Sequence, residues 1–182
     1  RWTDPRHRFP LNLHIQALRI LGSDPRADLG FLKLAAERAL ESPDPRVRFE
    51  AVQAIHQAKA QSALLPMLRN LFKERDRLVF YAIWQAMRDL LPAAQRKLLV
   101  KHEHPRIRLA GLLSLQADFA LTQQEALDLV EKEKDSEVRS WALTYAVNPR
   151  PKKLPNSKSR IEFEQTLSIG QLIQRAEKAL SL

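Results

Sequence analysis

Arginines and aspartates that recur at one spacing are the side chains of this sequence best suited to chemistry. A guanidinium group binds anions, so the arginines could line a groove that binds an anionic partner. Their periodic placement is also explained by bonds from each arginine to an aspartate or a carbonyl of a neighbouring repeat, and we favour this structural interpretation. The residues assigned to this inter-repeat role are Asp44, Arg48, Arg108, Asp135 and Arg139.

A cluster of His102, Glu103 and His104 suggests a metal site at first sight. Helical zinc motifs place two histidines at i and i+4 on one face. Here one histidine ends an expected helix and the other starts the next, so the two side chains point in different directions. We expect a capping or turn role for His104 and no metal ligand. His14 and His56 are isolated helix residues to which no role is assigned.

Motifs for catalysis and cofactor binding are missing from the sequence. It has no cysteine, which excludes disulfides, thiolate metal sites and covalent haem within this chain. It also has no Gly-rich phosphate loop, no G-x-S-x-G elbow and no H-E-x-x-H motif. We therefore expect no catalytic residue, no cofactor and no metal.

A repeated segment would position the arginines on helices. Four stretches that start at Asp44, Asp76, His104 and Asp135 share one register of apolar residues. Such spacing places the apolar side chains on one helical face, and the leading aspartate can cap the helix. The first apolar column holds Val47, Val79, Ile107 and Val138; the second holds Ala51, Ile83, Gly111 and Ala142; the third holds Val52, Trp84, Leu112 and Leu143.

Each repeated helix needs a partner that covers its apolar stripe. The expected partners are residues 24–40, 62–72, 93–102 and 122–133, the last opened by a capping box of Thr122 and Glu125. A helix over residues 11–21 looks like an unpaired half-repeat that caps the N-terminal end. The sequence thus predicts an all-α fold, an α-solenoid of about four helical hairpins plus a capping helix, as one domain over residues 1–147.

The repeat stops after Val147. Residues 148–160 form a basic, Pro-rich linker with five basic residues and no acid. Residues 161–182 regain an amphipathic spacing and are expected to cover the open C-terminal end of the stack or to pack on a neighbouring domain. The apolar positions of this segment are Leu172, Ile173, Ala176, Ala179 and Leu180.

The pattern Asp-Pro-x-Val-Arg-x-x-Ala-x-x-Ala-[Ile/Leu] resembles the HEAT-repeat family over residues 24–147, and Pro66 resembles the proline of that family's first helix. The resemblance implies that the second helix of each pair lines a concave side. The second repeat departs from the pattern, because Phe80 replaces the arginine and Ile83 replaces the small residue. A continuous ladder of Asp and Arg is therefore in doubt at this repeat.

A narrower resemblance is to bacterial multidomain proteins that join a β-propeller, HEAT repeats and a cytochrome c domain. It rests on DPRVRFEAVQAI and DRLVFYAIWQAMRDL. This resemblance implies a middle module and a periplasmic, extracytoplasmic location. The chain begins Arg1-Trp2-Thr3, and we interpret it as a piece of a longer protein.

The expected function is a non-catalytic protein-interaction scaffold or interdomain spacer, whose partner is a protein or a neighbouring domain of the same chain. The net charge of +9 leaves open an alternative, a nucleic-acid-binding domain like the HEAT-like DNA glycosylases. No apolar run is long enough to span a membrane. Core packing is expected for Trp84. The candidate concave surface comprises Glu50, Gln53, Gln57, Tyr81, Gln85, Arg88 and Thr144, with Asp89 beside them.

Overall fold

The computed structural model describes residues 11–147, and these residues are helical with no strand among them. The predicted linker 148–160 and capping segment 161–182 lie outside the described residues. The helices are α1 (Leu11–Ser23), α2 (Leu29–Leu40), α3 (Pro45–Gln57), η2 (Gln61–Ala63), α4 (Leu64–Leu71), α5 (Arg77–Leu90), α6 (Ala93–Leu99), α7 (Pro105–Ala117), α8 (Gln123–Lys132) and α9 (Ser136–Val147). The all-α prediction is confirmed.

The chain divides into two compact units, with the boundary between Pro92 and Ala93. The first unit contains α1 to α5, and the second contains α6 to α9. The sequence predicts one domain over residues 1–147, and this stays a prediction.

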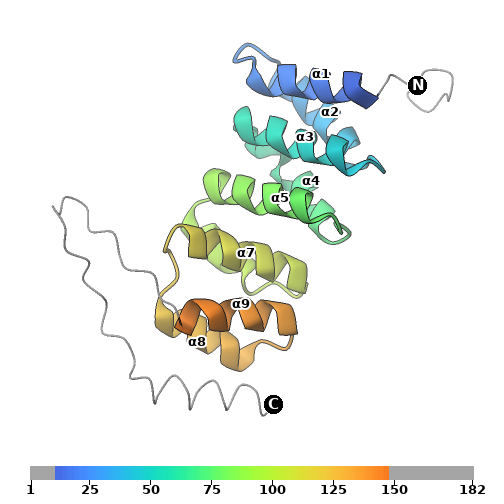
Figure 1. The fold of residues 1–182 in the computed structure, drawn as a ribbon. Helices are drawn as coiled ribbons and strands as arrows, with labels where there is room; N and C mark the ends of the chain where they lie inside the picture. Colours follow the sequence, from blue (N-terminus) through green and yellow to red (C-terminus); the bar gives the residue numbers. More distant parts are fainter. Residues whose placement is uncertain (1–10, 148–182) are drawn as a thin grey trace. The chain divides into compact units, whose positions relative to one another are not determined.

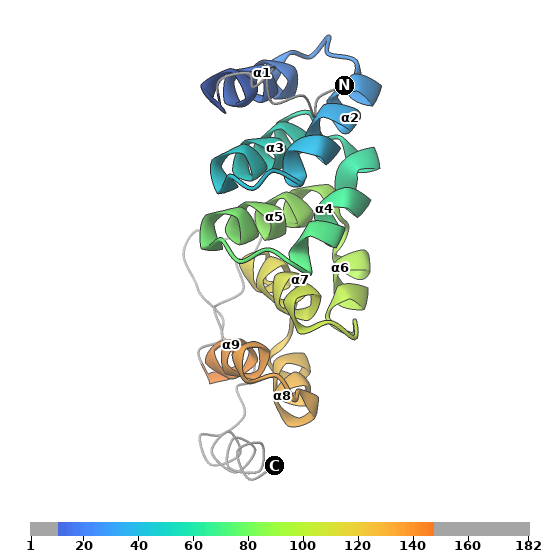
Figure 2. The same ribbon diagram turned by 90° about the vertical axis from the view of Figure 1, so that its right-hand side faces the viewer.

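Helical hairpins build both units. In each hairpin a first helix (α2, α4, α6 or α8) packs against the second helix that follows it (α3, α5, α7 or α9). In the first unit α1, α3 and α5 form one layer and α2 and α4 form the other (Figures 1 and 2). In the second unit α7 packs on α9. Neighbouring hairpins within a unit therefore meet through their second helices.

Aspartate side chains cap several of these helices, as the sequence predicts. Oδ1 of Asp44 accepts from the backbone N–H of Arg46, and Oδ1 of Asp76 accepts from those of Leu78 and Val79. Asp135 caps the first turn of α9 in the same way, and Thr122 and Glu125 form the predicted capping box. Each cap satisfies donors that the helix itself cannot satisfy.

One predicted helix start needs correction, and of the two roles expected for His104, cap or turn, the structure shows the turn. The first partner helix begins at Leu29 rather than near residue 24, because Asp28 caps it and residues 24–28 form a turn. His104 does occupy the N-cap position of α7, but its side chain makes no capping bond. Instead, its backbone N–H donates to Nδ1 of His102 at 3.0 Å, so the side chain of His102 shapes this turn.

The predicted apolar columns lie in the core. All members of the Val47 column and of the Ala51 column are buried. In the third column Trp84 is also buried, as predicted, and Leu143 is half-buried. The register read from the sequence is therefore the one in which the helices pack.

Glycines set two close helix contacts. A Cβ added at Gly22 of α1 would lie 2.6 Å from the Cα of Ala54 in α3, so the two helices touch backbone to backbone at this point. A Cβ added at Gly111 of α7 would lie 3.0 Å from the Cβ of Leu99 in α6. Gly111 belongs to the second apolar column, in which three of the four residues are alanine or glycine.

Candidate interaction surface

The arginine of the repeat binds a buried glutamate of the next hairpin. In the first unit Nε and Nη2 of Arg48 donate to Oε2 and Oε1 of Glu74, each at 2.8 Å. Nη1 of Arg48 donates to the carbonyl oxygens of Ser42 and Pro43 at 2.9 and 3.1 Å. Glu74 also accepts from the side chain of Asn70. This set of bonds fixes the loop before α3 to the loop before α5.

The second unit repeats this geometry almost atom for atom. Nε and Nη2 of Arg108 donate to the two carboxylate oxygens of Glu133 at 2.7 and 2.6 Å. Nη1 of Arg108 donates to the carbonyl oxygens of His102 and Glu103. We call each of these arrangements the Arg–Glu clamp: Arg48 with Glu74 in the first unit, and Arg108 with Glu133 in the second.

Burial and pairing oppose each other in setting the pKa of the two glutamates. Burial alone would raise the pKa of Glu74 and of Glu133. Each carboxylate also accepts hydrogen bonds from its paired arginine and from backbone N–H groups. Together these bonds outweigh the effect of burial, so both pKa values lie below the ordinary value for glutamate. Both carboxylates are therefore charged in the clamp at neutral pH.

The clamp corrects part of the structural prediction. The role of Arg48 and Arg108 in joining hairpins is as expected, but their acidic partner is a glutamate rather than an aspartate. The carbonyls that they bind belong to the loop of their own hairpin. Asp44 and Asp135 act instead as helix caps, and Arg139 lies half-buried on α9.

The glutamates that complete the clamp carry a signal that sequence reasoning missed. Glu74 and Glu133 each stand two residues before a capping aspartate, and each accepts the backbone N–H of that aspartate at 2.8 Å. The pattern Glu-x-Asp thus marks them. At the corresponding sequence positions of the remaining repeat the chain has Phe80 and His102, so neither residue type of the clamp is present there.

Polar side chains gather on the second helices of the first unit. Tyr81 and Gln85 of α5 are exposed, and Arg88 is half-buried. On α3, Gln57 is exposed and Gln53 is half-buried. We call the surface that these residues form with His56 and Asp89 the polar face. Its exposed members agree with the predicted contact surface.

Asp89 joins the two helices of the polar face. Its Oδ2 lies 2.8 Å from Nε2 of His56 on α3, and its Oδ1 accepts from Nε of Arg88 at 2.8 Å. The guanidinium of Arg88, and to a lesser extent His56, holds the pKa of Asp89 below its ordinary value against the effect of partial burial. The carboxylate and the guanidinium therefore lie side by side as a fixed charge pair, about two helical turns from Tyr81 along α5.

Tyr81 supplies the aromatic side chain of the polar face. It is 45% exposed, and its ring lies 5.2 Å from that of the buried Trp84 at an interplanar angle of 59°. A tilted contact of this kind holds the ring of Tyr81 in place. Tyr81 is therefore accessible to a partner while its ring packs against Trp84.

Two residues of the predicted surface do not belong to the polar face. Glu50 is only 8% exposed, because Arg19 of α1 covers it in an ion pair at 2.5 Å. The prediction that Glu50 is an exposed contact residue is therefore wrong. Thr144 is exposed but lies in the second unit, where its hydroxyl donates to the carbonyl of Ser140.

Within residues 11–147 no three potential ligand side chains from histidine, cysteine, aspartate or glutamate come together as a metal site would require. None of the helices described there has the length and apolar character needed to cross a membrane.

These features define an all-α protein made of helical hairpins that carries a polar, partly aromatic surface. Comparison with protein-family models, with curated proteins and with solved structures found no match to the chain.

Proposed function

We propose that this chain is a HEAT-type α-solenoid that acts as a non-catalytic scaffold and binds a protein, or a neighbouring domain of its own chain, through the polar face. The proposal rests on the exposed Tyr81 and, about two turns further along α5, the charge pair of Arg88 and Asp89. Tyrosine and arginine are the residues that most often dominate the energy of protein interfaces.

The HEAT assignment is supported by the recurrence of local structure. Each unit contains the same hairpin, the same aspartate cap and the same clamp, with Arg48 and Glu74 in one unit and Arg108 and Glu133 in the other. In a solenoid one hairpin repeats along the chain, and each hairpin contacts only the hairpins next to it. Their stacked second helices then present a continuous surface to a partner.

Protein is a better partner than nucleic acid on electrostatic grounds. Nucleic-acid binding depends on cations that neutralise phosphates. Two of the arginines that could line an anion-binding groove are Arg48 and Arg108. Each of them is paired with a buried glutamate. Arg88 lies against Asp89, whose carboxylate would repel a phosphate. A polypeptide supplies the mixed donors and acceptors that this surface can satisfy.

A displayed random-peptide library, selected on the full chain, provides the probe. The triple variant Tyr81→Ala, Gln85→Ala, Arg88→Ala should bind a selected peptide at least ~100-fold more weakly, because it removes the central anchors. A matched variant, Leu65→Ala with Arg69→Ala, changes two exposed residues of α4 and should bind normally. Equal affinities of the two variants would contradict the assignment of the polar face.

Duplex DNA at low salt tests the alternative partner. If DNA phosphates bind the polar face, the affinity for DNA should fall steeply with added salt and should be lost in the triple variant. We expect no DNA binding that depends on Tyr81, Gln85 or Arg88. A salt-sensitive complex that the triple variant abolishes would replace the protein-binding proposal with a nucleic-acid one.

A further inference from the structure

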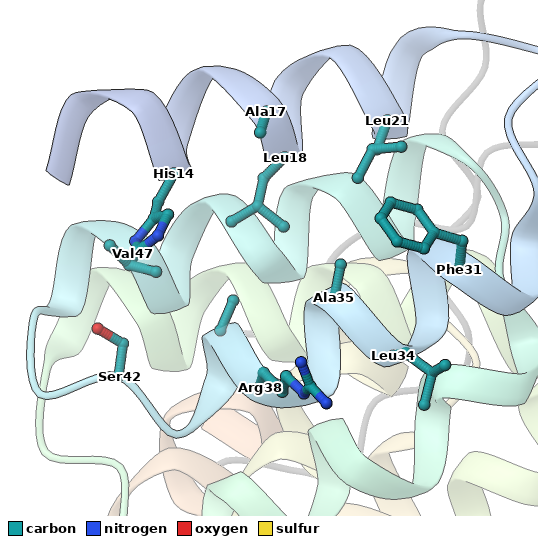
Figure 3. Close-up of a pocket in the computed structure, with 11 residues that line it drawn as sticks. His14, Ala17, Leu18, Leu21, Phe31, Leu34, Ala35, Arg38, Ser42 and Val47 are labelled. Atoms are coloured by element: carbon teal, nitrogen blue, oxygen red, sulfur yellow. The ribbon is translucent and has the colours of Figure 1, made fainter. Parts of the chain in front are cut away.

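An apolar groove lies between α1 and α2 in the first unit, on a different surface from the polar face. Its volume is about 600 Å³. Leu18 and Leu21 of α1 point into it from one side, and Phe31 and Leu34 of α2 line the other (Figure 3). Phe31 and Leu34 remain 59% and 58% exposed. Such a set of apolar side chains gains free energy when another apolar surface covers it.

The position of α1 indicates what kind of element would cover the groove. Helix α1 packs on α3 in the same layer as the second helices α3 and α5 (Figure 2). Among residues 11–147, α3, α5, α7 and α9 each follow a first helix, whereas no first helix precedes α1. The groove is thus where a first helix would pack against α1 and beside α2.

The contacts of α2 show what a first helix requires. It packs most extensively on α3, the second helix of its own hairpin, and less on α1 and α4. The residues that it buries are Leu32, Ala36 and Leu40. A helix that fills the groove should carry the same buried triplet towards α1.

Residues 168–182 have the sequence of such a helix. Aligned with residues 28–42, they have the same residue at Gly170, Leu172, Ala176, Glu177, Ala179 and Leu180 as α2 has at Gly30, Leu32, Ala36, Glu37, Ala39 and Leu40. The match includes all three residues that α2 buries. Ser168 stands where Asp28 caps α2, and serine is a favoured N-cap residue.

We propose that the groove receives residues 168–182 from a second copy of this chain, bound as an α-helix that completes a hairpin with α1. The helix would bury Leu172, Ala176 and Leu180 against α1. A second copy is the proposed source because it can deliver the segment without requiring any particular arrangement of the two units within one chain. The proposal does not depend on the function of the polar face.

The expected assembly follows from the two different surfaces involved. Each molecule offers one groove and one segment, so the contact is heterologous and leaves a groove and a segment unused at the ends of every open assembly. Association should therefore continue beyond the dimer as concentration rises. Sedimentation velocity on the full chain measures this directly.

Two variants should each block self-association. Leu34→Asp places a charge at an exposed position of the groove, and Ala176→Asp places one in the proposed buried triplet. Burying either unpaired charge should weaken association at least ~100-fold. Leu65→Asp, at a similarly exposed leucine of α4, and Gln174→Asp, which aligns with the exposed Leu34, should associate like the parent. Circular dichroism checks that all four remain helical.

Mixing the two blocked variants gives the decisive result. The Ala176→Asp chain keeps an intact groove, and the Leu34→Asp chain keeps an intact segment, so the mixture should form a one-to-one dimer that grows no further. This result also shows that both variants are folded. A parent chain that stays monomeric at all concentrations, a mixture that stays monomeric, or a control variant that associates as weakly as Ala176→Asp would overturn the proposal.

Discussion

Arg48 holds Glu74 in a bidentate pair across two hairpins, and the glutamate side chain is fully buried while the arginine side chain is 16% exposed. Removal of one partner from a buried pair leaves the other charged and unsatisfied. The pair therefore joins hairpins only while both residues are present. Arg108 and Glu133 stand in the same relationship in the second unit.

Loss of Arg48 should be costly. Arg48→Met strands the carboxylate of Glu74, and we expect the free energy of unfolding to fall by about 3–5 kcal/mol. Urea denaturation followed by circular dichroism measures the change. Arg46→Met, which breaks an exposed pair with Asp44, should cost far less than Arg48→Met, because solvent screens the exposed pair. The double variant Arg48→Met, Glu74→Leu should recover much of the loss, and a failure to recover would show that Arg48 acts through other contacts.

Acid should weaken the clamps. The folded pKa values of Glu74 and Glu133 lie below the unfolded value, so their contribution to stability is complete above the unfolded pKa and is lost as pH falls through the folded pKa. Stability should thus decline as pH drops below the ordinary glutamate value of 4.5. Urea midpoints from neutral pH downwards test this decline. In the variant Arg48→Met, Glu74→Leu the decline should be shallower; an unchanged slope would exclude Glu74 as a source.

Gly22 should not tolerate a methyl group. Gly22→Ala would push α1 away from the backbone of Ala54, and overpacking of this kind costs about 1–3 kcal/mol. That cost outweighs the gain of about 1 kcal/mol that alanine brings to an exposed helix interior. Thermal unfolding of Gly22→Ala compared with Gln16→Ala, an exposed change on the same helix, separates the two effects. A more stable Gly22→Ala protein would mean that α1 and α3 do not approach so closely.

A glycine at residue 59 should stabilise the protein. Lys59 follows α3 with a positive φ of 51°, a conformation that glycine adopts without the steric cost of a Cβ. Lys59→Gly should raise the free energy of unfolding by about 0.5–1 kcal/mol. Lys59→Ala keeps the Cβ and should leave stability nearly unchanged. Equal effects of the two substitutions would assign the change to loss of the lysine charge.

Local sequence signals predicted the helices and their register well. Asp44 and Asp76 are recognisable as helix caps because a short acidic side chain just before an apolar helix can accept the backbone N–H groups of its first turn. The buried Ala51 column follows equally from periodicity. The start of the first partner helix was wrong, because Asp24 and Asp28 are both capable caps and only the folded turn selects Asp28.

Contacts between hairpins were harder to predict. Nothing local to Glu50 indicates that Arg19 of α1 will cover it, because the two residues meet only when the helices pack. The sequence predicts an aspartate or a carbonyl of a neighbouring repeat as the partner of Arg48, yet the aspartates are occupied at helix starts and Glu74 has the reach to enter the clamp. Tyr81 and Gln85 were placed correctly, since a helix with one buried face must expose the other.

The affinity of Tyr81→Ala for a peptide selected on the parent chain tests the assignment of the polar face most directly. The dissociation constant should rise at least ~10-fold in Tyr81→Ala, as expected for a central aromatic anchor. In Leu65→Ala, which removes an exposed apolar side chain from α4, it should stay within about twofold of the parent value. A Tyr81→Ala protein that binds the peptide as tightly as Leu65→Ala would contradict the polar face as the binding surface.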